Sequence, residues 1–232
     1  MKLITRTQLG WPPSAAPSQT GQIGVKVHYE GTPVPKVDHS KCAGRWTAIR
    51  NSHLANTKEN YSDVAYNFAV CQHGYVLEGR GIGFRTGANG NQELNRKHYA
   101  VLVMIGSSGD TQPSEAAITA LREVILYLRE HGAGNEIKGH RDGYATDCPG
   151  DALYALVKSG KLEPIKEDDE DMPSAKEVAE AVWGYGIKNR FRGDRVIPAK
   201  YTMEWADSHY DELMKKLVDL AAKVDELSKK LP

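Results

Sequence analysis

The sequence lacks the marks of several protein classes. Lys plus Arg and Asp plus Glu both total 30 among the 232 residues, so the formal net charge is zero. That balance gives no indication of a nucleic-acid partner or an anionic membrane surface. No apolar run approaches the roughly 20 residues that span a bilayer. Residues 1–17 are interrupted by polar residues and prolines, unlike a secretory signal. We therefore expect synthesis in the cytosol without a signal peptide and without membrane insertion.

Cysteine is also scarce. The chain has only three cysteines, Cys42, Cys71 and Cys148. They are too few and too unevenly spaced for a disulfide framework, which agrees with a reducing compartment. An odd cysteine then needs another role, and metal binding is one candidate.

What the sequence does contain, over residues 1–162, is the pattern of an α/β domain. Apolar and β-branched runs predict strands over residues 23–29, 65–70, 74–77, 99–105 and 137–140. Helices are predicted over residues 42–54, 114–131 and 151–158, and Ser114 and Gly132 can begin and end the second of them. Interleaved strands and helices indicate a mixed central sheet flanked by helices.

A different pattern follows this domain. Residues 163–174 hold an acidic run that is too polar to bury, and this predicts a linker. Residues 175–232 are predicted to be helical, with a heptad seam over residues 203–231. A helix lying on its own domain would need a wider apolar stripe. The seam therefore favours an α-helical coiled-coil tail and a homo-oligomer.

Three side chains suggest a metal site. His28 and His140 stand at the ends of two predicted strands, and Cys148 lies in the loop after His140. Two imidazoles and a thiolate suit zinc, and three protein ligands leave one tetrahedral position open for water. Spacing alone is a weak signal, because the chain has 8 histidines and a lone His or Cys more often has a structural role.

Four stretches make the pattern more specific. They are VHYEGT (residues 27–32), YSDVAYNFAV (61–70), GYVLEGRG (74–81) and GHRDGYATDCPGDAL (139–153). In this order they resemble the motifs of the zinc N-acetylmuramoyl-L-alanine amidases related to peptidoglycan recognition proteins, a family that includes phage endolysins. The resemblance covers nearly all of residues 1–162, and it implies a zinc amidase catalytic domain there.

The resemblance implies a role for each matching residue. His28, His140 and Cys148 match the three ligands of a Zn²⁺ cofactor. Tyr66 matches the active-site tyrosine of the family. Thr146 stands where some phage members carry lysine and recognition-type amidases carry threonine, so a lysine-based mechanism is not expected here.

Several further residues are interpreted through the same resemblance. His53 is a candidate substrate-binding residue at the groove, with a solvated helix-end histidine as the alternative. Asn89 replaces a histidine found in many members, cannot act as an acid or base, and is kept as a second substrate-binding candidate. Cys42 resembles a disulfide cysteine whose partner position is Ser62 here, so Cys42 and Cys71 are expected to be buried, inert thiols.

Asp142 follows the second proposed ligand by two residues and has two interpretations. It is either a partner that fixes an imidazole tautomer or a turn-stabilising residue before Gly143.

The implied activity is hydrolysis of the amide bond between N-acetylmuramic acid and L-alanine in bacterial peptidoglycan. Tyr66 and Thr146 would donate hydrogen bonds to the developing oxyanion or orient the attacking water. The expected role is that of a phage endolysin, which reaches the cell wall through a membrane pore and causes host lysis. A cytosolic cell-wall recycling amidase and a non-catalytic peptidoglycan-binding module remain alternatives, and residues 175–232 are a candidate cell-wall-binding region.

Overall fold

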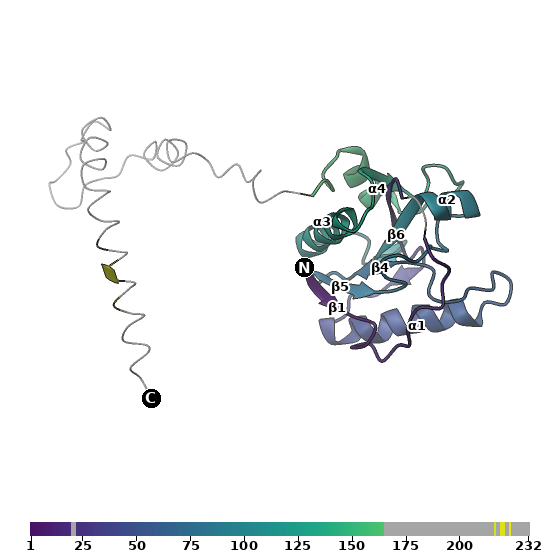
Figure 1. Cartoon of the computed structure of the whole chain (residues 1–232), viewed down its shortest axis with the longest axis horizontal. Helices are drawn as coiled ribbons and strands as arrows, with labels where there is room; N and C mark the ends of the chain where they lie inside the picture. The colour runs from purple at the N-terminus through teal and green to yellow at the C-terminus, as the bar shows by residue number, and fades with distance from the viewer. Residues whose placement is uncertain (20–21, 165–215, 217–218, 221–222, 224–232) are drawn as a thin grey trace. The chain divides into compact units, whose positions relative to one another are not determined.

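The computed structural model describes residues 1–19, 22–164, 216, 219–220 and 223, which are the coloured parts of Figure 1. The chain divides into two units, Met1–Glu167 and Asp168–Pro232, and the strands and helices named below belong to the first unit. The predicted linker beyond residue 164 and nearly all of the predicted heptad seam lie outside the described residues. Among the described residues, no helix combines the length and apolar character needed to cross a bilayer.

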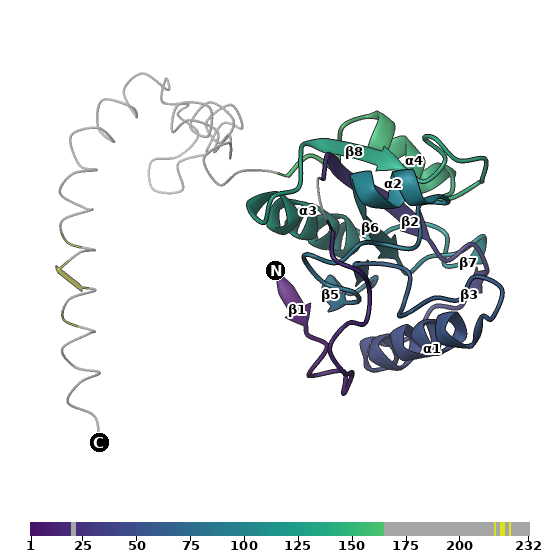
Figure 2. The ribbon, with the colours of Figure 1, turned by 45° about the vertical axis from the view of Figure 1, so that its right-hand side comes forward.

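A six-stranded sheet forms the centre of the domain. Its strands lie in the order β1 (Lys2–Ile4), β5 (Tyr75–Glu78), β4 (Phe68–Val70), β6 (His98–Val103), β2 (Gly24–Tyr29) and β8 (Glu136–Gly139). Only β4 and β5 are antiparallel, and the other neighbouring pairs are parallel. The mixed central sheet predicted from the sequence is therefore confirmed. Two short strands, β3 (Pro33–Val34) and β7 (Ser108–Gly109), pair beside it (Figure 2).

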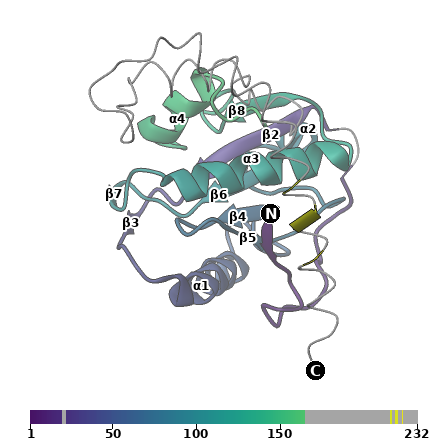
Figure 3. The ribbon, with the colours of Figure 1, turned by 90° about the vertical axis from the view of Figure 1, so that its left-hand side faces the viewer.

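Helices cover both faces of the sheet (Figure 3). Helix α3 (Glu115–Glu130) packs on one face with Val25, Val27 and the other members of one buried cluster. Helix α1 (Cys42–Ala55) packs on the other face through Trp46. Because successive side chains of a strand point to opposite faces, Lys26 and His28 lie on the face that α1 covers. This alternation places His28 away from the main apolar core.

The strongest periodic patterns give elements close to their predicted bounds. Ser114 caps α3 by accepting a hydrogen bond from the Ala117 backbone N–H at 3.0 Å, and Gly132 follows the helix with φ of 92°. Helix α4 (Asp151–Lys158) also forms as expected. Three short elements were not predicted, because such short segments show too little periodicity. They are β1, the 3₁₀ helix η1 (His39–Lys41) and the six-residue helix α2 (Gln92–Lys97).

Candidate metal centre and active site

The fold brings the three proposed metal ligands together. His28 lies near the end of β2, and His140 directly follows β8. In the parallel pair β2–β8, Val27 is the partner of Gly139, so the next residue of each strand is a histidine at the same sheet edge. Their ring centroids are 4.5 Å apart. The Sγ atom of Cys148 lies 3.6 Å from Nδ1 of His28, and one donor atom from each residue lies within 4.8 Å of the others.

The protonation states of these groups suit a metal ion. Burial lowers the pKa of His28 well below its usual value and lowers the pKa of His140 to about 4, so both imidazoles are neutral at pH 7. Burial raises the pKa of the Cys148 thiol to about 11, and a bound cation would convert that thiol to the thiolate. Nε2 of His140 is buried and has no hydrogen-bond partner among the described residues. Two nitrogens and a sulfur with an unpartnered buried nitrogen fit zinc.

Asn89 fixes the orientation of the first histidine. Its Nδ2 donates to the backbone oxygens of Leu94, at 3.2 Å, and His98, at 3.0 Å. This leaves Oδ1 to accept from Nε2 of His28 at 2.9 Å, so Nδ1 is the nitrogen free to bind a metal beside Cys148. Asn89 has no exposed surface. It therefore lies behind the proposed ligand His28 and has no surface for contact with a substrate, unlike the role expected from the sequence.

Lys26 and Asp142 shape the loop that carries His140. Lys26 is 1% exposed, and its Nζ donates to the backbone oxygens of His140, at 3.4 Å, and Asp142. Asp142 accepts from the Gly139 N–H at 2.8 Å and from the Tyr154 hydroxyl at 2.7 Å. Asp142 is therefore a turn-stabilising residue. Lys26 was not among the predicted site residues, although a lysine within an otherwise apolar strand is a signal of a buried polar role.

Tyr66 and His53 lie beside this centre. The Tyr66 ring meets the His28 ring edge-on, with centroids 5.3 Å apart. Burial raises the pKa of Tyr66, so its phenol remains a hydrogen-bond donor at neutral pH. Nδ1 of His53 accepts from the Ala65 backbone N–H at 3.0 Å, next to Tyr66, and the two rings lie 5.8 Å apart. His53 is thus built into the structure that holds Tyr66 rather than being a freely solvated histidine.

Thr146 and Tyr144 come from the loop between His140 and Cys148, the second and third proposed ligands. The Thr146 hydroxyl oxygen accepts from the Cys148 backbone N–H at 3.2 Å, and this bond does not use its hydrogen. Tyr144 stacks on His140, with ring centroids 5.2 Å apart, and is 45% exposed. It was missed in the sequence, where one exposed tyrosine carries no distinguishing signal. A cavity of about 300 Å³ adjoins the loop and is lined by Tyr29, Asp147 and other residues.

Comparisons with known proteins agree with this geometry. The family model described as N-acetylmuramoyl-L-alanine amidase matches residues 24–151. The N-acetylmuramoyl-L-alanine amidase of Sus scrofa is 31% identical over 141 residues, which are 57% of this chain but 22% of that protein. The chain thus spans about a fifth of the length of that relative.

Solved structures share the fold. Drosophila PGRP-LB matches with a TM-score of 0.59 and 20% identity, over 72% of this chain and 98% of that one. Human PGRP-IβC in complex with glycosamyl muramyl pentapeptide matches with a TM-score of 0.57 and 20% identity, over 68% and 94% of the two chains.

Proposed function

Because the chain belongs to the N-acetylmuramoyl-L-alanine amidase family, we propose that it hydrolyses the amide bond between N-acetylmuramic acid and L-alanine in bacterial peptidoglycan. The cluster of His28, His140 and Cys148 carries the proposal. Its two imidazole nitrogens and one thiol sulfur lie close together, beside the hydroxyl-bearing side chains of Tyr66 and Thr146. A set of three ligands leaves one position of a tetrahedral ion for water or substrate. That open position suits a hydrolase better than a purely structural site.

The chain's own residues would divide the work as follows. His28, His140 and Cys148 would hold zinc, which supplies a Lewis acid and a bound water with a pKa of about 7. Tyr66, protonated at neutral pH, would donate a hydrogen bond to the carbonyl oxygen as negative charge develops on it. Thr146 has a hydroxyl hydrogen free for the same oxygen or for the attacking water.

The surrounding residues would hold this arrangement in place. Asn89 keeps His28 in the tautomer that directs Nδ1 toward Cys148. Lys26 fixes the backbone after His140. His53 ties α1 to the backbone before Tyr66, and we propose that its other ring nitrogen faces the substrate groove.

The test is digestion of purified sacculi by the full chain, followed by measurement of newly released L-alanine amino termini. We expect release with zinc present, loss after chelation, and recovery when zinc is restored. A zinc-loaded protein that sediments with sacculi but releases no amino termini would instead be a non-catalytic binding module.

We also propose that the biological role is that of a phage endolysin, made in the cytosol and released to the wall through a membrane pore. The three cysteines are free in the structure, which agrees with synthesis in a reducing compartment, where disulfides are rare. Co-expression with a pore-forming protein should lyse the host, whereas expression alone should not. Cleavage of soluble muropeptides without cleavage of intact sacculi would favour a recycling amidase.

A further inference from the structure

A second group of metal-type side chains lies outside the proposed active site. His39, Cys42, Cys71 and His73 each offer one donor atom, and these atoms lie within 4.8 Å of one another. We call these residues the Cys₂His₂ cluster. None of the four belongs to the ligand set around His28, and the proposed amidase mechanism uses none of them.

Two local structures bring the cluster together. His39 begins η1, and Cys42 is the first residue of α1, so one short segment supplies both. Cys71 directly follows β4, and His73 lies in the turn that leads to β5. That turn closes with a hydrogen bond from the Gly74 N–H to the Cys71 backbone oxygen at 3.1 Å. The cluster therefore lies where the start of α1 meets the β4–β5 hairpin.

The distances are close to those of a tetrahedral zinc site. Nδ1 of His73 lies 3.5 Å from Sγ of Cys42, and Nδ1 of His39 lies 4.0 Å from Sγ of Cys71. Zinc bonds of about 2.3 Å to sulfur and 2.0–2.1 Å to nitrogen, at tetrahedral angles, separate the two atoms by about 3.6 Å. Both pairs therefore need only small side-chain movements to share one ion.

The surroundings also suit a single ion. Cys42 is 3% exposed and Cys71 is fully buried. A cavity of about 20 Å³ is lined by both cysteines and His73, which is room for one species the size of water. His39 is held by stacking on Tyr75, with ring centroids 3.8 Å apart. Two thiolates would neutralise a divalent cation, so the loaded site would add no net charge to this buried region.

We propose that His39, Cys42, Cys71 and His73 bind a second zinc ion, with a structural role. Four protein ligands fill a tetrahedral ion and leave no position for substrate. The ion would clamp the start of α1 to the β4–β5 turn, and α1 also carries His53 at its other end. From the sequence, Cys42 and Cys71 are expected to be inert thiols. Under this proposal they are ligands, and the site does not depend on the proposed amidase function.

The experiment uses the fact that the chain has only three cysteines. In the full-length Cys148→Ser variant, every remaining thiol belongs to the cluster. Purified under reducing conditions and loaded with zinc, wild type should hold about two ions per chain and Cys148→Ser about one. After exchange of zinc for cobalt(II), Cys148→Ser should still show thiolate-to-cobalt charge-transfer absorption.

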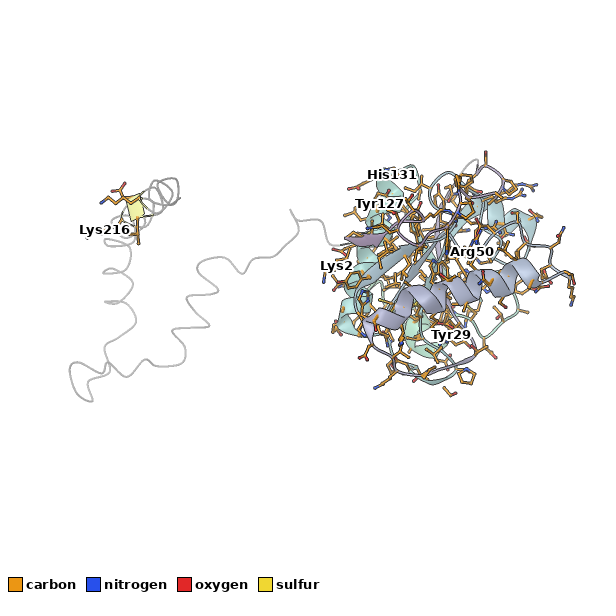
Figure 4. All side chains as sticks on the ribbon, turned by 90° about the horizontal axis from the view of Figure 1, so that it is seen from below. Lys2, Tyr29, Arg50, Tyr127, His131 and Lys216 are labelled. Atoms are coloured by element: carbon orange, nitrogen blue, oxygen red, sulfur yellow. The ribbon has the colours of Figure 1, made fainter. Side chains whose placement is uncertain are left out.

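Two further variants locate the ion. Cys42→Ser/Cys71→Ser should hold about one zinc per chain and melt several degrees below wild type. His131→Ala is the matched control, because His131 is exposed and belongs to neither group of candidate ligands. It also lies at the opposite side of Figure 4 from Tyr29, the neighbour of His28. This variant should keep about two ions per chain, even though it loses the hydrogen bond and ring contact that His131 makes with Tyr127.

Cys148→Ser protein without zinc and without charge-transfer absorption would overturn the proposal, even if the Cys42→Ser/Cys71→Ser variant failed to fold. A Cys42–Cys71 disulfide found by mass spectrometry in the reduced, zinc-supplemented protein would overturn it too. An inactive protein that holds two ions would contradict only the proposed function.

Discussion

Replacing Tyr66 with phenylalanine isolates one hydroxyl group in the proposed mechanism. The Tyr66 ring meets His28 edge-on, with centroids 5.3 Å apart. A Phe ring should keep this contact, so the fold and the proposed metal site should be preserved. Burial raises the pKa of the Tyr66 phenol, so wild type presents a protonated donor throughout the neutral range. The substitution removes this donor and leaves the ring in place.

The expected loss follows from the cost of removing one oxyanion donor, about 2.7–4 kcal/mol of activation free energy, or about a hundredfold to a thousandfold in rate. The assay is the initial rate of amino-terminus release from sacculi, measured beside zinc content and melting temperature. A Tyr66→Phe variant with wild-type zinc content and near wild-type rate would refute the assignment of Tyr66. A variant that lost zinc would show that the phenol supports the metal site instead.

The other predictions concern neighbouring residues and the tail. Asn89→Leu removes the acceptor that fixes His28 and should weaken zinc binding about 10–100-fold in a chelator competition, so unchanged affinity would contradict that role. Burial lowers the pKa of His53 to about 4, so the stability contributed by its neutral form above about pH 6.5 is lost as the pH falls toward 4. In urea unfolding, wild type should therefore lose about 1–2 kcal/mol more than His53→Gln between pH 7 and pH 5. A chain ending at Lys161 should elute as a monomer while the full chain elutes as an oligomer, and monomers in both cases would contradict the coiled-coil prediction.

The sequence alone predicts the mixed sheet and the longer helices, whereas the grouping of His28, His140 and Cys148 as one proposed ligand set was implied by the family resemblance. A long periodic pattern of apolar residues, such as that of residues 114–131, predicts both the helix and its buried face. His28 lies near the end of β2 and His140 follows β8, and the pairing of these strands was not predictable. Their adjacency therefore came from the family resemblance rather than from periodicity. Nearly all of the predicted oligomerisation seam lies outside the described residues, so the seam stays a prediction.

Partners fixed by tertiary contacts could not be predicted in the same way. Asn89 reaches His28 across 61 residues of sequence, and no local pattern marks that contact. Lys26 lies on the α1 face because β2 alternates, and its contact with the loop after His140 depends on the pairing with β8. The Cys₂His₂ cluster had a sequence signal in two short His and Cys pairs, but only the folded hairpin brings the two pairs together.

The central claim is that Cys148 and two histidines hold the ion that supports amide hydrolysis. Metal analysis and sacculus digestion of wild type beside Cys148→Ser test it most directly. We predict that the variant keeps the fold, loses one zinc equivalent relative to wild type and releases no amino termini from sacculi. A Cys148→Ser protein that binds as much zinc as wild type and digests sacculi at the wild-type rate would contradict the account.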